Sequence, residues 1–508
     1  MTTATTIKNS GTRRIPPALN AAASTARRLH PLVWLYLIGV LLPIGFDLGT
    51  LSLSLLRTLL LLTTVPLFFG LIAGRFGKVY PVDWLFFLHM CWATVAIAVN
   101  NPNKVVENIG STAIEFLGGY LIARAFIRSR EDFIALVRVL GVMVCLTVPL
   151  AVSESVTDVS VIAQLISSVG LQPPYQVDMA PRMDLFRAQT VFAHPIHYGL
   201  FCSAAFSLVF VGMKGTMNGV MRYLIAFAVL CGVFLSLSSG ALLAVFLQIS
   251  LIAWAFGFRN LPRRWTLLLA LFGTMYVVID LLSNRTPIRV LMTYATFSTH
   301  NAYYRAVIYE WGMINVWANP IFGLGLRPWV RPGWMHTTSV DNFWLVSAMR
   351  YGIPGFLLLA LGYLDALVRV GRKKLVDGSP ESQLRLAWMI TFCGLSFTLI
   401  TVHIWTTVYS FVFFLLGSGL WIASASSEGT VETKAQAPAG PAYARARQTV
   451  LTRAPLEPSE TTDHARPANV FATAARPSPV PDQEPKAERE ATPYTRFPGG
   501  PKKRRTDP

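Results

Sequence analysis

Charged residues are scarce in this sequence. Asp, Glu, Lys and Arg make up 14% of the 508 residues, while hydrophobic residues make up 53%. A soluble domain usually carries about a quarter charged residues, so a chain built mainly of soluble domains is excluded. The apolar residues occur in runs of roughly 20, the length that a helix needs to cross a bilayer. Because a backbone in lipid must satisfy its own hydrogen bonds, we predict an all-α, polytopic integral membrane protein.

Cysteine is also rare, and its placement indicates neither a metal centre nor a disulfide. The five cysteines lie within apolar runs and lack the spacing of metal ligands: Cys91, Cys145, Cys202, Cys231 and Cys393. Small thiols in such runs usually pack as hydrophobes. The long polar segments have no Gly-rich Walker loop and no Asp-x-Asp pair. We therefore expect neither a metal nor another cofactor.

Acidic residues are outnumbered by basic ones. The chain has 44 Lys and Arg against 26 Asp and Glu, a net charge of +18. Of the 44, 13 follow Ala425, five precede Pro31, and most of the rest lie in short loops. This distribution indicates membrane orientation and no nucleic-acid partner. No short apolar core follows Arg13-Arg14, so we expect no cleaved signal peptide.

The apolar runs predict about twelve transmembrane helices. They cover residues 31–48, 51–73, 82–99, 109–127, 132–153, 195–213, 219–236, 238–257, 264–283, 352–370, 384–404 and 405–425. Basic residues follow every even-numbered span as far as the tenth, and the short odd-numbered exits carry almost none apart from Lys104. Because positively charged loops stay inside, we predict cytoplasmic termini. Two long segments, 154–194 and 284–351, then lie on the outer side.

Three regions follow from this pattern. Residues 1–30 form a basic cytoplasmic segment, 31–425 a transmembrane domain and 426–508 a proline-rich tail without helical periodicity. Such a tail cannot bury a core, so we expect it to be disordered, cytoplasmic and dispensable for catalysis. Its end, Lys502-Lys503-Arg504-Arg505, suits contact with anionic lipid, and the alternative is a solvated tail without a partner.

Arginine dominates the second outer segment. Residues 284–351 contain no lysine, two acids (Glu310 and Asp341) and six arginines: Arg285, Arg289, Arg305, Arg327, Arg331 and Arg350. Guanidinium groups make planar bidentate contacts to phosphate oxygens, and ammonium groups do not. The bias favours a lipid-linked phosphate ligand over simple anchoring at the interface. Residues 303–317 predict an amphipathic helix lying against the membrane interface.

The first outer segment adds Arg182 and Arg187, again without lysine. It returns to the membrane through His194 and His197, which should lie at the mouth of the helical bundle. Each histidine either takes part directly in the chemistry or forms hydrogen bonds at the interface.

Two charged residues lie within predicted spans. Arg57 and Glu115 are each six residues inside the outer end of their helix, or about 9 Å deep at 1.5 Å per residue. Equal depth allows an ion pair, or Arg57 lines a cavity. The alternative is that Arg57 extends to the membrane surface.

The second outer segment also carries a sequence motif. Arg305 and Trp311 precede Asn319-Pro-Ile-Phe-Gly323-Leu-Gly325, then come His336, Asp341-Asn342-Phe-Trp-Leu345 and Tyr351-Gly352-Ile-Pro-Gly355. This order resembles the O-antigen ligase/polymerase family of bacterial envelope glycosyltransferases. Asn342, Leu345, Gly352 and Gly355 match the register of the family motif. Arg187 to Pro195 resembles the family's second element, and the resemblance covers about residues 30–425.

One position departs from the family pattern. The resemblance places the catalytic histidine directly before Asn342, and Asp341 stands there in this chain. His336 lies five residues upstream. Either residue could serve as the general base.

The resemblance implies an enzyme of the bacterial inner membrane that polymerises polyprenyl-pyrophosphate-linked oligosaccharide repeats without a metal, in the exopolysaccharide branch. Arg187 and Arg305 would bind the donor pyrophosphate, with Arg289 and Arg327 as weaker candidates and Asn342, His197, Arg57 and Glu115 in support. Expected partners are lipid-linked glycans, membrane lipids, and chain-length and export proteins. The alternatives are a ligase that moves a finished glycan to another acceptor, and a transporter or lipid flippase.

Overall fold

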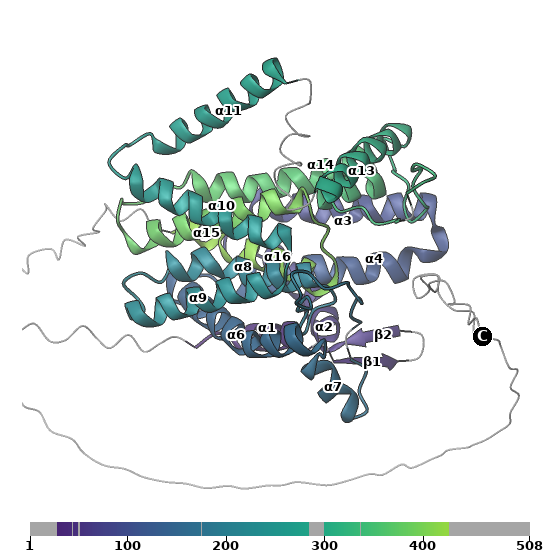
Figure 1. The fold of residues 1–508 in the computed structure, drawn as a ribbon, viewed down its shortest axis with the longest axis horizontal. Coiled ribbons are helices and arrows are strands. Elements are labelled where there is room, and N and C mark those ends of the chain that lie inside the picture. Colours follow the sequence, from purple (N-terminus) through teal and green to yellow (C-terminus); the bar gives the residue numbers. More distant parts are fainter. Residues whose placement is uncertain are drawn as a thin grey trace, which may run out of the picture. The chain divides into compact units, whose positions relative to one another are not determined.

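The computed structural model describes residues 28–42, 44–48, 51–173, 175–283, 299–335 and 337–425. Most of these residues are helical, and the strands among them form one antiparallel hairpin of β1 and β2 (Figure 1). The elements are α1 Pro31–Leu41, β1 Gly45–Leu48, β2 Leu51–Ser54, α2 Leu55–Ile72, α3 Pro81–Asn100, η1 Pro102–Lys104, α4 Val105–Ala113, η2 Ile114–Gly118, α5 Gly119–Phe126, α6 Arg130–Thr157, α7 Val161–Ser168, α8 Pro195–Phe210, α9 Gly219–Leu235, α10 Ser239–Gly257, α11 Arg264–Leu282, α13 Thr299–Ala318, α14 Phe343–Gly371, α15 Pro380–Leu399, α16 Thr406–Ser418 and α17 Trp421–Ser424.

Many of these helices are suited to a membrane. In the described part of the chain, seven helical segments are long and apolar enough to cross it: Leu55–Ile72, Pro81–Asn100, Arg130–Thr157, Ser239–Gly257, Arg264–Leu282, Phe343–Gly371 and Thr406–Ser424. Three shorter helices, α1, α8 and α9, are also apolar. The prediction of an all-α, polytopic membrane protein is confirmed.

The prediction of a helix over the whole of residues 31–48 is wrong. The helix α1 ends at Leu41, and Gly45 pairs with Ser54 in a hairpin that continues to Leu48 opposite Leu51. Pro43 lacks the backbone N–H that a helix needs and Gly45 disfavours a helix, so an apolar composition alone was misleading here. The Ser54 side chain then caps α2 by accepting the N–H of Arg57 at 3.2 Å.

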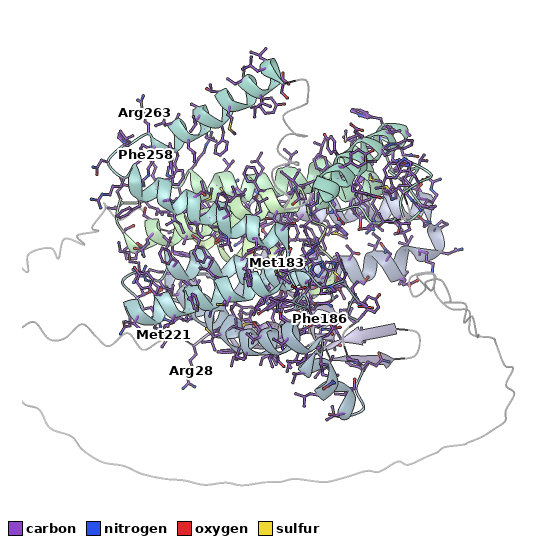
Figure 2. All side chains as sticks on the ribbon, in the orientation of Figure 1. Arg28, Met183, Phe186, Met221, Phe258 and Arg263 are labelled. Atoms are coloured by element: carbon purple, nitrogen blue, oxygen red, sulfur yellow. The ribbon has the colours of Figure 1, made fainter. Side chains whose placement is uncertain are left out.

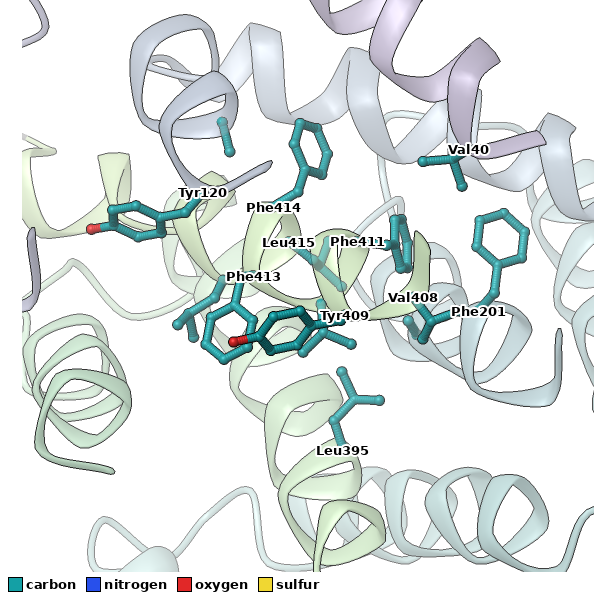
Figure 3. Close-up of a cluster of buried hydrophobic side chains, with 14 of the residues drawn as sticks. Val40, Tyr120, Phe201, Leu395, Val408, Tyr409, Phe411, Phe413, Phe414 and Leu415 are labelled. Atoms are coloured by element: carbon teal, nitrogen blue, oxygen red, sulfur yellow. The ribbon is translucent and has the colours of Figure 1, made fainter. Parts of the chain in front are cut away.

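Most of the hydrophobic core forms around α16, which is buried along nearly its whole length (Figure 3). The ring of Phe414 stacks on Tyr36 of α1 at 4.4 Å, and that of Phe413 meets Phe116 of η2 edge-on at 4.4 Å. A Cβ at Gly119 of α5 would lie 2.6 Å from the carbonyl oxygen of Ser410, so these two helices approach closely. The close approach fixes α5 and η2 against the centre of the bundle.

Helix α3 distinguishes the two ends of the bundle. Near its start, Asp83 pairs with Arg124 of α5. At its other end, the side chain of Asn100 donates to the carbonyls of Phe322 and Gly323 at 3.2 Å each. The 20 residues of α3 span about 30 Å. We call the end that carries Asn100 the loop end, and the hairpin and α13 lie there in Figure 1.

Candidate active site

Arg187 lies in the long loop between α7 and α8, and the backbone directly after it is fixed. The carboxylate of Glu154, near the end of α6, accepts the backbone N–H groups of Gln189 at 3.0 Å and Thr190 at 2.7 Å. Figure 2 shows the neighbouring Met183 and Phe186 on this loop, well away from Met221 at the start of α9. A buried glutamate therefore holds the loop against the bundle.

The Arg187 side chain is buried and only partly satisfied. It is 6% exposed, its Nη1 contacts the sulfur of Met179 at 3.2 Å, and its Nε has no hydrogen-bond partner among the described residues. Burial, and then the positive charge of Arg182, lower the pKa of Arg187 to about 10. Because buried charges are normally paired, this guanidinium group is suited to an anionic ligand.

Arg305 on α13 is in a similar state. Its Nη1 is buried without a partner in the described part of the chain. Burial lowers the pKa of Arg305, the nearby carboxylate of Asp341 opposes that shift, and the charge of Arg182 adds to it. Arg182 is thus an electrostatic neighbour of both Arg187 and Arg305. We call these three residues the arginine cluster, and Asp341 lies beside it.

Asp341 stands directly before α14, and it does not cap that helix. The capping residue is Asn342, whose side-chain oxygen accepts the N–H of Leu345 at 3.0 Å. Asp341 is half-buried, and its Oδ1 accepts a hydrogen bond from the hydroxyl of Ser339 at 2.8 Å. A structural role as a helix cap, the simplest alternative to a chemical one, therefore belongs to the neighbouring residue.

Three histidines surround Trp405 in the loop between α15 and α16. The ring centroid of Trp405 lies 4.0 Å from that of His197, 5.8 Å from His194 and 5.8 Å from His403. The Nε2 of His197 and the Nδ1 of His403 are buried without partners among the described residues. These aromatic rings lie beside the arginine cluster, and two of their ring nitrogens have no hydrogen-bond partner among the described residues.

His194 is held in its neutral form. Burial, and then the charges of Arg187 and Arg182, lower the pKa of His194 to about 4. Its Nδ1 accepts the N–H of Ile196 at 3.0 Å and so caps α8. Protonation would remove this acceptor, so the neutral ring is also the form that supports the helix.

A cavity of about 80 Å³ lies beside these loops. His403, Trp405, Arg350 and Glu115 are among its lining residues. The carboxylate of Glu115 accepts from the Nε of Arg57 at 2.8 Å, so the expected ion pair forms, and the acid rather than the arginine lines the cavity. Glu115 lies in η2, a π-helical turn within a span, and such turns often mark functional sites.

The turn at residues 319–327 contacts both α3 and α14. The backbone of Gly352 has φ 73° and ψ 178°, and a Cβ there would lie 2.0 Å from the carbonyl oxygen of Ile321. Arg327 donates to the side-chain oxygen of Asn100 at 2.5 Å and to the carbonyl of Leu324 at 3.3 Å. Arg327 is therefore occupied in holding this turn on α3.

A comparison with known families gives one match over part of this region. A family model described as O-antigen ligase matches residues 224–360. This region, about a quarter of the chain, is thus similar to the O-antigen ligase family. A search of curated proteins gives no match. The resemblance predicted from the sequence motif is confirmed.

The matched region contains Arg305, Asp341, Asn342 and Gly352, whereas Arg187 and the histidines around Trp405 lie outside it. The fold brings the two sets together, because the charge of Arg182 acts on Arg187 and His194 of one set and on Arg305 of the other. Two predicted site residues, His336 and Arg289, lie outside the described residues.

The site predicted from the sequence did not include His403 and Trp405. The span prediction hid both residues. It assigned His403 to the end of one predicted span and Trp405 to the start of the next. The structure instead ends α15 at Leu399 and begins α16 at Thr406, which leaves both residues in a loop beside the site. The cluster of polar residues at 401–406 between two apolar runs was the available signal.

The predicted amphipathic helix is present as α13, but its apolar face is divided. Val307 and Ile308 are buried in a second, smaller core with Leu345 and Met349 of α14, whereas Trp317 is 66% exposed. Only the exposed part is left for a membrane interface. The buried part fixes α13, and hence Arg305, against α14.

Proposed function

We propose that this protein joins glycans by transfer from a polyprenyl-pyrophosphate donor at the outer face of the bacterial inner membrane, as a polymerase of lipid-linked repeats. One observation carries the proposal: Arg187 in the loop before α8 and Arg305 on α13 each present a buried guanidinium nitrogen without a partner among the described residues. The similarity of residues 224–360 to the O-antigen ligase family supports it.

In the proposed reaction, a hydroxyl oxygen of the acceptor sugar forms a bond to the anomeric carbon of the donor. The bond from that carbon to the phosphate oxygen breaks, and the lipid pyrophosphate leaves with the electron pair. Negative charge grows on the leaving group, where the arginine cluster can stabilise it. The proton of the acceptor hydroxyl passes to Asp341, or to His336 if that residue is the base.

The orientation of the site is part of this proposal. The short loops at the end opposite the loop end carry Lys78, Arg128 and Arg372, among other basic residues. Positive loops are retained in the cytoplasm, which puts the arginine cluster outside. A lipid-linked donor there carries its own activation energy in the pyrophosphate bond, so no nucleotide is required at that face.

The test uses charge-conserving substitutions in the full-length protein. We expect Arg187→Lys and Arg305→Lys each to lower glycan transfer about 100-fold, because lysine keeps the charge and loses the bidentate geometry. Arg331→Lys is the matched control, since the Nε of Arg331 is already bonded to the carbonyl of Met335 at 3.2 Å. Transfer is measured with the cognate lipid-linked repeat in membranes from cells that lack the native protein.

Near-normal transfer by both cluster variants would contradict the proposal. The description of the matching family as O-antigen ligase favours one second candidate, transfer of a finished glycan to a different acceptor. The same assay separates the two. A polymerase makes a ladder of products from the donor alone, whereas a ligase gives a product only after the second acceptor is added.

A further inference from the structure

A larger cavity lies at the end of the bundle opposite the loop end. Its volume is about 440 Å³, within the usual range for ligand pockets. Four cationic side chains line it, contributed by the α2–α3 turn, α5, the α5–α6 turn and the segment after α14: Lys78, Arg124, Arg128 and Lys373. Tyr80 and Trp421 are also among its walls. We call this space the basic cavity.

Among the described residues no acid lines the basic cavity, although the carboxylates of Asp83, Asp132 and Asp365 lie nearby. Asp83 accepts from the Nε of Arg124 at 3.0 Å and from its Nη2 at 3.1 Å, and Asp365 accepts from Arg369 at 2.7 Å. Asp83 and Asp365 are thus already engaged, and Asp132 accepts the backbone N–H of Arg128 at 3.3 Å. Within the described residues, Lys78 and Lys373 form no ion pair, so positive charge in the cavity is left uncompensated.

The wall formed by Trp421 supplies a second, independent indication. Trp421 is 6% exposed and lines the cavity, and its indole Nε1 is a buried donor without a partner among the described residues. Native proteins seldom leave such a donor unpaired. Another lining residue, Tyr80, has its ring centroid 5.1 Å from the guanidinium carbon of Arg124 and 4.9 Å from that of Arg369.

We propose that the basic cavity binds a phosphate-bearing anion. Lys78 and Lys373 supply charge, Arg128 supplies a guanidinium group, and the N–H of Trp421 donates a hydrogen bond to a phosphate oxygen. The phosphate belongs either to the headgroup of a membrane lipid or to a soluble molecule. The site is separated from the arginine cluster by the length of α3 and does not depend on the proposed glycan transfer.

The test uses delipidated full-length protein and native mass spectrometry with two probes, phosphatidylglycerol and inorganic pyrophosphate, and with phosphatidylcholine as the neutral-lipid comparison. We expect the wild-type protein to retain an anionic probe and Lys78→Gln/Lys373→Gln to lower its affinity about tenfold or more. Lys214→Gln/Arg263→Gln is the matched control. It removes the same charge from two exposed residues that lie in other loops.

Each outcome decides the proposal. Loss of phosphatidylglycerol binding in the cavity variant alone supports a lipid headgroup, and loss of pyrophosphate binding alone supports a soluble ligand. Trp421→Phe keeps an aromatic side chain but removes the indole N–H, and it should weaken binding of the same probe. It replaces the double variant in the test if that variant is unstable. Failure of wild type to bind either probe, or equal losses in the cavity and control variants, would overturn the proposal.

Discussion

At the scale of single residues, two members of the arginine cluster, Arg187 and Arg305, are unusual because each has a buried guanidinium nitrogen without a partner among the described residues. Arg187 is 6% exposed and has no carboxylate bonded to it in the described residues. The nearby carboxylate of Glu154 contacts the backbone of Gln189, two residues further along the chain. That acid is engaged by two backbone N–H groups instead. Leaving a buried charge uncompensated disfavours the folded protein, so an anionic substrate is the physical reason that best accounts for it.

Asp341 gives the sharpest residue-scale prediction. We expect Asp341→Asn to lower transfer by about 10²- to 10⁴-fold with normal expression, because asparagine cannot accept the proton of the acceptor hydroxyl. Capping cannot explain such a loss, since Asn342 is the cap. Ser339→Ala is the control, because it removes the hydrogen bond to Asp341 and keeps the carboxylate.

The parallel variant His336→Gln identifies the base. Loss of transfer in His336→Gln together with normal transfer in Asp341→Asn would assign the proton to His336. Wild-type rates in both would place the chemistry elsewhere in the protein.

At the scale of elements, the joint between the 319–327 turn and α14 determines where Arg305 and Asp341 lie. The N–H of Ile353 donates to the carbonyl of Pro320 at 2.7 Å, and the N–H of Leu324 donates to that of Met349 at 2.7 Å. The φ and ψ angles of Gly352 belong to a region that is essentially limited to glycine. The glycine of the sequence motif is therefore a requirement of the backbone.

We expect Gly352→Ala to destabilise the protein by about 3 kcal/mol or more, because of backbone strain and the clash with the carbonyl oxygen of Ile321. Gly110→Ala is the matched control, since a Cβ on Gly110 in α4 would meet nothing within 4 Å. Thermal unfolding of purified protein measures both changes. Equal melting temperatures for Gly352→Ala and wild type would show that the joint is not needed.

At the scale of the whole molecule, the core depends on the last helices of the described chain. Helix α16 is central in Figure 3. The indole N–H of Trp388 on α15 donates to the backbone carbonyl of Leu415 in α16 at 3.1 Å. The chain after residue 425 lies outside the described residues. Its composition, with 13 of the 32 prolines after Glu428, cannot bury a core of its own.

Removal of all residues after Glu428 should therefore leave transfer within about twofold of wild type, since the core and the candidate site lie earlier in the chain. Polymer synthesis in cells that lack the native protein measures this, with membrane expression checked by immunoblot. A stop codon after His403 serves as the contrast, because it deletes α16 and should abolish stable protein. Complete loss of transfer in a well-expressed Glu428 truncation would show that the tail is required.

The sequence by itself determined the class of protein and part of the site. A bilayer requires backbone hydrogen bonds within each segment, so apolar runs of span length had to be helices. The arginine bias and the family resemblance indicated Arg305 and Asp341 from the sequence alone. Only the tertiary structure placed Arg187 in the same electrostatic group as Arg305, because that proximity depends on how loops far apart in sequence pack on the bundle. It likewise assigned the cap to Asn342 and put His403 in a loop, since burial and hydrogen-bond partners are properties of the packed chain.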